Sequence, residues 1–189
     1  MRKLVSFMHI SLDGFVGGLN GELDWITHGG EIFDYAQDRT SQSDTALYGR
    51  ATYQIMQDYW PTAADAPDAS KHDIEHAKWY AKVKKVILSR TWQGREIPNT
   101  TIISNSLAEN INAVKNQEGK EIVIFGSPGA THSLMLQDLI DEYWFFVNPI
   151  ILGKGITLFR GNEERINLRL IKTRAFSSGV VCLHYERKK

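Results

Sequence analysis

Hydrophobic and polar residues alternate between two periods along the first 140 residues of the chain. Apolar runs of strand length occupy residues 4–10, 45–49, 84–89, 99–104 and 121–125. Between them, apolar residues recur at helical spacing over residues 31–42, 50–59, 72–82 and from 106 onward. The near-continuous apolar run at 121–125 is typical of a strand that is covered on both faces. Alternating strands and helices predict a mostly parallel sheet with helices on both sides, a three-layer α/β architecture.

The pattern changes in the C-terminal third of the chain. Four strand-like segments follow one another with little helical pattern between them, at residues 143–147, 156–159, 168–173 and 180–185. Ser177-Ser178-Gly179 has the composition of a hairpin turn between the last two segments. We therefore expect antiparallel strands at the edge of the parallel sheet. With no internal repeat and no low-complexity tract, residues 1–189 are predicted to form a single domain.

Two shorter segments add local detail to this outline. Residues 61–70 hold two prolines and several small or acidic side chains, so they are predicted to form a surface loop. Ser106 and Glu109 have the spacing of a capping box, in which each side chain bonds to the backbone of the other residue. This pair predicts the start of a helix at residue 106.

Composition narrows the class of function. The chain has 22 Lys and Arg residues against 22 Asp and Glu residues, so no net charge favours nucleic acid or an anionic membrane. It contains no run of about 18 apolar residues and no signal-peptide pattern after Met1, so we expect a cytoplasmic protein. Cys182 is the one cysteine and lies in an apolar run. We expect a buried thiol there, not a nucleophile, and no intramolecular disulfide.

A glycine-punctuated segment carries the clearest functional signal. Residues 122–135, IVIFGSPGATHSLM, have the pattern of a buried strand that breaks at Gly126 and continues as a helix. The first N–H groups of a helix lack intrahelical partners and attract anions, phosphate above all. Ligands of open α/β sheets lie beyond the carboxyl ends of the strands, where this turn is expected. It is therefore a candidate phosphate site, and a tight turn that needs glycine only for its backbone dihedrals is the alternative.

Two further strand ends carry groups that suit a phosphate. The chain again passes from a strand to a helix at Gly49, with Arg50 in the first helical turn. A cation there opposes the helix dipole, and a phosphate held jointly by Arg50 and the helix N–H groups would balance it. A solvated arginine or a salt bridge is the alternative. Ser89, Arg90 and Thr91 place two hydroxyls and a guanidinium beyond another strand, which suits a phosphomonoester such as the 2′-phosphate of NADP.

The remaining candidates are a carboxylate, a tryptophan and a histidine pair. Asp13 follows the first strand and is a candidate contact for substrate or a catalytic water, with an Asx-turn as the alternative. Trp25 follows a glycine-rich stretch and is expected to form an apolar pocket wall. His72 and His76 have metal-binding spacing on a helix, but no third ligand is evident, so we interpret them as a solvated face and predict no metal site. A cofactor is then expected to carry the chemistry.

With these motifs placed, the chain resembles the dihydrofolate reductase-like superfamily. It is most similar to the branch that contains the reductase domain of the riboflavin-pathway deaminase-reductase, the RibD C-terminal domain. The resemblance extends from Arg2 to about Tyr185. The matching motifs, in order, are Ser11–Gly14, Leu47–Tyr53, Val86–Thr91, Phe125–Gly129 and residues 139–155.

The resemblance implies a three-layer dihydrofolate reductase-like fold, a homodimer and NADPH bound across the glycine turns. The implied reaction is hydride transfer to a pterin-like or pyrimidine-like heterocycle, as in dihydrofolate reductase or 5-amino-6-(5-phosphoribosylamino)uracil reductase. It implies a substrate contact at Asp13 and a nicotinamide near Asp13 and Trp25, the two candidate catalytic residues. By position it assigns cofactor contacts to Gly49, Arg50, Thr52, Ser89, Arg90, Thr91, Gly126, Ser127, Pro128, Gly129, Ala130 and Thr131.

The chain departs from the family pattern at three places. Gly126-Ser127-Pro128 stands where dihydrofolate reductases have Gly-Gly, and Phe15 stands where the riboflavin branch typically has lysine. No acid aligns just after Trp25, where dihydrofolate reductases carry the residue that protonates the substrate. A non-catalytic nucleotide-binding or regulatory module that has kept the fold is therefore an alternative. Another is a structural dimer whose interface is built from residues 143–146 and 148–155.

Overall fold

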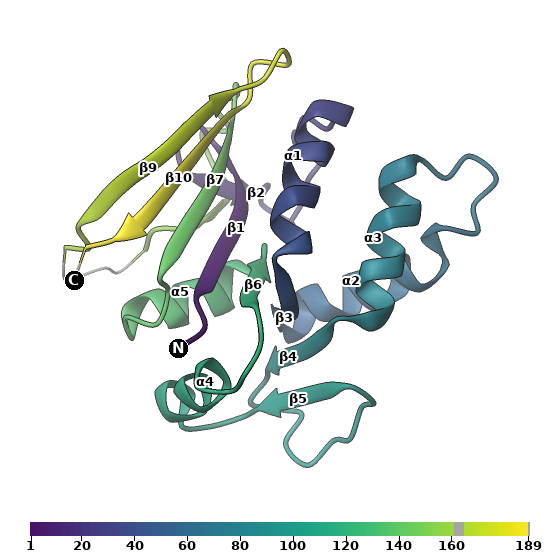
Figure 1. Cartoon of the computed structure of the whole chain (residues 1–189). Coiled ribbons are helices and arrows are strands. Elements are labelled where there is room, and N and C mark those ends of the chain that lie inside the picture. Colours follow the sequence, from purple (N-terminus) through teal and green to yellow (C-terminus); the bar gives the residue numbers. More distant parts are fainter. Residues whose placement is uncertain (161–164, 189) are drawn as a thin grey trace.

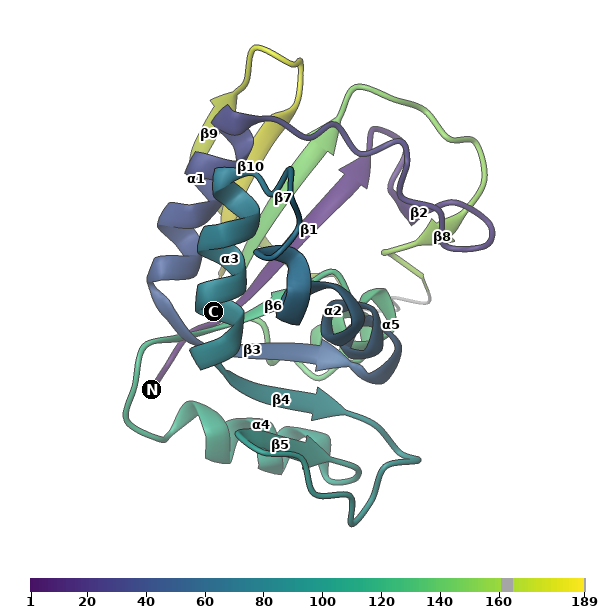
Figure 2. The ribbon, with the colours of Figure 1, turned by 90° about the vertical axis from the view of Figure 1, so that its right-hand side faces the viewer.

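The computed structural model describes residues 1–160 and 165–188, and its main feature is one eight-stranded sheet. The strands run in the order β5-β4-β3-β6-β1-β7-β10-β9 across this sheet (Figure 2). Their bounds are β1 Leu4–Ser11, β3 Ser43–Gly49, β4 Lys84–Leu88, β5 Thr100–Ile103, β6 Glu121–Phe125, β7 Glu142–Asn148, β9 Leu168–Ala175 and β10 Val181–Arg187. A separate two-stranded ribbon pairs β2 (Phe15–Gly17) with β8 (Ile156–Thr157).

The first six strands of the sheet are parallel, as the alternating pattern predicts. The neighbouring pairs from β5 to β7 all run in the same direction. The two strands at the other edge, β10 and β9, are antiparallel and form a hairpin, as expected from the C-terminal pattern. Its turn uses Gly179 at a φ of 84°, with the Gly179 amide bonded to the Phe176 carbonyl at 2.9 Å. The predicted α/β fold class is confirmed.

Helices cover both faces of the sheet (Figure 1). The helices are α1 Gly30–Ser41, α2 Arg50–Ala63, α3 Lys71–Lys82, α4 Leu107–Lys115 and α5 Pro128–Leu136. Side chains such as Tyr35, Tyr53 and Tyr80 pack α1, α2 and α3 on one face. Ile111 and Leu134 pack α4 and α5 on the other. Alternate residues of each buried strand face opposite layers, which explains the near-continuous apolar pattern of the strands.

Two local expectations need correction. The predicted loop at 61–70 begins later, because α2 continues through Pro61 to Ala63. Ser106 precedes α4 as expected but makes no side-chain cap bond. Its left-handed backbone (φ 43°, ψ 51°) directs the hydroxyl away from the turn that a capping box closes. Asn110 Nδ2 bonds instead to the carbonyl oxygens of Asn105 and Ser106, at 3.0 and 3.2 Å.

The aromatic strand at 143–146 is not an exposed interface. It belongs to β7, between β1 and β10, so both of its edges are paired. Its four aromatic side chains are all buried, with Phe146 fully inaccessible. Residues 143–146 therefore supply no interface to the expected structural dimer, because their side chains form the core. The part of that interface expected at residues 148–155 stays a prediction. Cys182, on the neighbouring β10, is buried as expected, and burial raises the pKa of its thiol to about 12.

Candidate functional site

Three parallel strands and three helix N-termini meet at one cavity of about 450 Å³. Gly49 and Leu88 end β3 and β4, and Ile103 ends β5, and all three line this cavity. Helix α2 follows Gly49, helix α4 follows Ser106, and the first turn of α5 contributes Gly129 and Ala130. This is the carboxyl edge of the parallel sheet, where open α/β sheets bind ligands. We call it the anion cavity.

The helix N-termini at the anion cavity have no side-chain caps. None of the N-cap residues of α2, α4 and α5 makes a side-chain cap bond, and neither α2 nor α5 has an acid in its first turn. Helix α3, which does not reach this cavity, has a complete capping box between Ser70 and Asp73. Uncapped N-termini leave N–H donors unpaired and carry partial positive charge. Among the described residues that line the cavity, Arg90 is the only charged one, so the cavity suits an anion.

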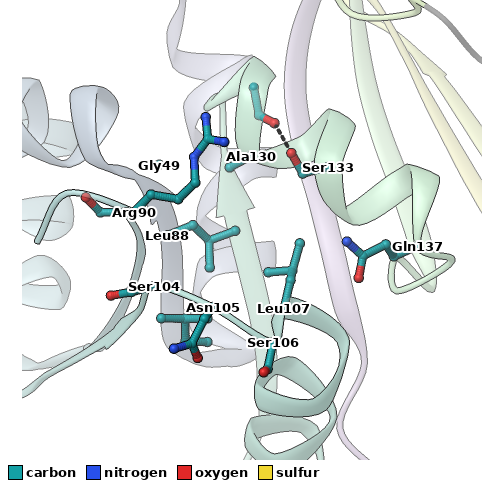
Figure 3. Close-up of a pocket in the computed structure, with 13 residues that line it drawn as sticks. Gly49, Leu88, Arg90, Ser104, Asn105, Ser106, Leu107, Ala130, Ser133 and Gln137 are labelled. Atoms are coloured by element: carbon teal, nitrogen blue, oxygen red, sulfur yellow. Dashed lines mark hydrogen bonds between the residues drawn. The ribbon is translucent and has the colours of Figure 1, made fainter. Parts of the chain in front are cut away.

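The side chain of Arg90 extends across the cavity. Its guanidinium points toward the beginning of α5, where Ala130 lies (Figure 3). Ser89 lines the cavity beside it, with its Oγ 3.4 Å from Oγ1 of Thr91. Thr91 itself is exposed and lies outside the lining. The structure thus brings Ser89 and Arg90 together with Gly49 and the first turn of α5, as the sequence predicts.

The turn between β6 and α5 is held by its own hydroxyl groups. Gly126 and Ser127 both have a φ of 52°, in the left-handed region, so the chain reverses sharply before Pro128 begins the helix. Ser127 Oγ donates to the Phe125 carbonyl and accepts from the Gly49 amide, both at 3.1 Å. Thr131 Oγ1 donates to the Gly126 carbonyl at 3.0 Å. These hydroxyls hold the turn in place, and the residues that follow it, Gly129 and Ala130, line the cavity.

The twelve predicted cofactor residues therefore divide into two groups. Those that line the anion cavity are Gly49, Ser89, Arg90, Gly129 and Ala130. Those outside its lining are Arg50, Thr52, Thr91, Gly126, Ser127, Pro128 and Thr131. Arg50 is exposed, and the structure places its Nη1 3.4 Å from Oε1 of Gln54.

Sequence reasoning missed the opposite wall of the anion cavity. It consists of residues 104–107, from the end of β5 to the start of α4, together with Ser133 on α5 and its C-cap residue Gln137 (Figure 3). The pair Ser106 and Glu109 predicted the start of a helix there. Nothing in the local sequence showed that this helix begins beside α2 and α5.

Asp13 and Trp25 do not line the anion cavity, nor do they line a second cavity that lies between α1, α2, α3 and the sheet. Asp13 accepts hydrogen bonds from Ser11 Oγ at 2.7 Å and from the amides of Leu152 and Gly153 at 3.1 and 2.7 Å. Desolvation raises the pKa of Asp13, but these hydrogen bonds together outweigh it and lower the pKa below its usual value. The carboxylate thus ties the loop after β1 to the loop after β7. Trp25 Nε1 donates to the Glu22 carbonyl at 3.0 Å.

A second cavity of about 210 Å³ lies between α1, α2, α3 and the sheet, and we call it the aromatic cavity. It includes His72 and His76, so their interpretation as a solvated helix face is wrong. His76 is buried against Trp60, with ring centroids 4.0 Å apart, and His72 stacks on Phe33 at 3.9 Å. Its lining is Phe7, His9, His28, Ile32, Phe33, Ala36, Gln37, Thr40, Met56, Trp60, His72, His76 and Phe125.

Burial keeps the inner histidines of the aromatic cavity neutral at pH 7. Desolvation lowers the pKa of His9 to about 4 and that of His76 to about 3, and it also lowers the pKa of His72. Within residues 1–160 and 165–188, no group of three or more His, Cys, Asp or Glu side chains is placed to hold a metal ion. Across the same residues, no helix is long and apolar enough to cross a bilayer.

Proteins of known sequence and structure resemble the chain along its whole length. The Uncharacterized protein YyaP of Bacillus subtilis (strain 168) is 35% identical over 187 residues, which cover 97% of this chain and 94% of that protein. A putative riboflavin biosynthesis protein from Shewanella sp. PV-4 has a structure that superposes with a TM-score of 0.71, at 21% identity and full coverage of both chains.

A third match relates the fold to a reductase with a bound cofactor. Dihydrofolate reductase from Enterococcus faecalis, in complex with NADP(H) and RAB-propyl, superposes with a TM-score of 0.66 at 15% identity. The match covers 99% of this chain and 97% of that enzyme, so the fold is dihydrofolate reductase-like. The family model described as the RibD C-terminal domain matches residues 2–182. The chain therefore belongs to the RibD C-terminal domain family.

Proposed function

We propose that the protein is an NADPH-dependent reductase that transfers a hydride to a small heterocyclic substrate. The observation that carries this proposal is the anion cavity. The N-termini of α2, α4 and α5 meet there without side-chain caps, and Arg90 is the one charged side chain among its described lining residues. The residues present suit a dinucleotide, because several phosphates can share the helix N–H groups and the guanidinium. The resemblance of the fold to an enzyme that binds NADP(H) supports the same cofactor.

Each part of the anion cavity has a distinct task in this proposal. The backbone of Gly129 and Ala130 and the start of α2 hold the diphosphate, and Ser89 and Arg90 hold the adenosine 2′-phosphate. NADPH, when bound, supplies the hydride. Helix α2 begins at the anion cavity, after Gly49, and extends to the aromatic cavity, where Met56, Trp60 and Phe125 would hold the acceptor ring. Asp13 positions the loop after β1 through its bonds to Leu152 and Gly153.

The test is a titration with NADPH and, separately, with NADH, followed by tryptophan fluorescence and calorimetry. We expect saturable binding of NADPH in the micromolar range and weaker binding of NADH. Absence of any saturable change up to millimolar NADPH would sink the proposal.

A non-catalytic nucleotide-binding module remains the second candidate. It is favoured by one observation, that no carboxylate lines the aromatic cavity among the described residues. A measurement of NADPH oxidation distinguishes the reductase from the non-catalytic module. A protein that binds NADPH but oxidises it with no pteridine, pyrimidine or quinone acceptor supports the module.

The homodimer implied by the family resemblance is a further part of the proposal. Strand β9 forms one edge of the main sheet, and Leu170 and Ile171 on it are exposed. Pairing of this edge between two copies would cover both side chains. Light scattering at micromolar protein concentration would measure the mass of the particle.

A further inference from the structure

The aromatic cavity has walls of ring faces and a floor on the sheet. Phe33 of α1 and His72 of α3 stack with ring planes 6° apart, and Trp60 of α2 lies against His76 of α3. Phe7 and Phe125, from adjacent strands, form the floor, with ring centroids 5.3 Å apart. A cavity of about 150 Å³ accepts one benzene ring, so 210 Å³ suits one or two fused rings. The walls select a flat aromatic molecule.

The cavity offers no partner for a charged group. Lys, Arg, Asp and Glu are absent from its described lining residues. At pH 7 its inner histidines are neutral, because desolvation lowers the pKa of His9 to about 4 and of His76 to about 3. The ion pairs that the structure describes on α1, such as Asp34 with Lys71 of α3, involve no residue of the lining. A phosphate or carboxylate inside the cavity would be desolvated without a counter-charge, which is costly.

One amide provides a directed hydrogen bond inside this lining. Thr40 donates its hydroxyl to the Gln37 backbone carbonyl at 3.0 Å and approaches Gln37 Oε1 at 3.3 Å. The oxygen of the Gln37 side-chain amide thus lies on the Thr40 side. Its Nε2 has no acceptor among the described residues and is available to a carbonyl oxygen of a bound ring.

We propose that the aromatic cavity takes an uncharged, planar oxo-heteroaromatic ring without a phosphate or carboxylate group, and that Gln37 recognises its carbonyl edge. This proposal rests on the proposed function, because it names the acceptor class of that reductase. It separates this chain from enzymes whose substrate carries a phosphoribosyl group into the site. Gln37 is a specificity-determining residue in this assignment.

The experiment uses two probes with the same ring. Lumazine is a neutral two-ring dioxo heteroaromatic compound at pH 6.5, and 6-carboxylumazine adds one carboxylate. Their binding to the whole chain is measured by probe fluorescence and calorimetry, and the Gln37 side-chain amide is followed by NMR. We expect lumazine to bind at least tenfold more tightly and to shift the Gln37 amide signal. Equal or tighter binding of 6-carboxylumazine would overturn the proposal, as would lumazine binding that leaves the Gln37 signal unmoved.

Matched variants test the role of the amide. Gln37→Leu removes the donor and should weaken lumazine at least fivefold, and Gln37→Glu adds a carboxylate and should weaken it at least tenfold. Gln54→Glu makes the same charge change on the exposed face of α2 and should leave lumazine binding unchanged. Thermal unfolding of each variant confirms that it is folded. If both Gln37 variants bind lumazine as the wild type does, Gln37 is not the recognition residue.

An NADPH titration on the same samples tests cofactor binding independently of ring binding. NADPH binding without lumazine binding contradicts the acceptor class and leaves the cofactor proposal standing. Lumazine binding without NADPH binding contradicts the proposed function and assigns the cavity to ring recognition alone.

Discussion

The backbone amide of Gly49 donates a hydrogen bond to the hydroxyl of Ser127 at 3.1 Å. These two residues are the N-caps of α2 and α5, so one bond joins the starts of two helices that are 78 residues apart in sequence. A side chain on Gly49 would place its Cβ 3.4 Å from the Cβ of Ala130. The two helix N-termini are therefore set against each other at close range, and both face the anion cavity.

Ser127→Ala should weaken both folding and cofactor binding. It removes the acceptor for the Gly49 amide and the donor to the Phe125 carbonyl at a site where the side chain is buried. An unpaired buried group costs about 1–3 kcal/mol, and urea unfolding should show a loss of that order. Because this bond would no longer hold the starts of α2 and α5 together, the Kd for NADPH should rise several-fold. Ser41→Ala is the control, because Ser41 Oγ bonds to the Asp38 carbonyl on α1 and lies outside both cavities.

Gly129→Asp should weaken cofactor binding without lowering the stability of the fold. The position is open, with nothing within 4 Å of an added Cβ, so the fold accepts the side chain. A carboxylate in the first turn interacts favourably with the helix dipole, by about 0.3–1 kcal/mol. The same carboxylate repels phosphate, so NADPH should bind at least tenfold more weakly while the melting temperature stays level or rises. Gly129→Asn provides the uncharged control of similar size. Equal losses of binding in both variants would point to steric blockage instead of charge.

Arg90→Ala should change the choice between the two nicotinamide cofactors. The guanidinium is the one charged group among the described residues of the anion cavity, and NADPH differs from NADH by the 2′-phosphate. We therefore expect the Kd for NADPH to rise at least tenfold and that for NADH to change little. Arg95→Ala is the matched control, because Arg95 lies over the ring of Trp92 and outside the cavity. Equal losses for both cofactors would remove Arg90 from the 2′-phosphate role.

The sequence predicted the strands and the glycine turns because both depend on local chemistry. Apolar runs marked each buried strand, and glycine marked the strand-to-helix junctions at Gly49 and Gly126. Which helices share a cavity depends on packing between distant segments, so the wall at residues 104–107 had no local signal. His72 and His76 were misinterpreted for the same reason. Their surroundings come from Phe33 on α1 and Trp60 on α2, and the flanking sequence does not report them.

The place of residues 143–146 in the sheet was likewise not predictable from the sequence. Its aromatic composition fits either an interface or a central strand. Only the pairing of β7 with both β1 and β10 decides between them. Register across a sheet is set by non-local contacts, which one sequence does not display.

His9 should make the protein sensitive to acid. Burial lowers the pKa of His9 from 6.5 to about 4, so the unfolded chain takes up a proton at a higher pH than the folded chain does. The stability associated with neutral His9 is fully present above pH 6.5 and is lost as the pH falls toward 4. His9→Phe keeps a ring that can stack on Phe146, where the His9 ring lies 5.0 Å away, and removes the titrating group. Between pH 7 and pH 4.5 we expect the free energy of unfolding of the variant to fall by about 2 kcal/mol less than that of the wild type. Urea unfolding at the two pH values measures this difference. His132→Gln, on α5 and outside the aromatic cavity, should retain the acid sensitivity of the wild type. Identical pH dependence in His9→Phe and the wild type would show that another group controls the loss of stability.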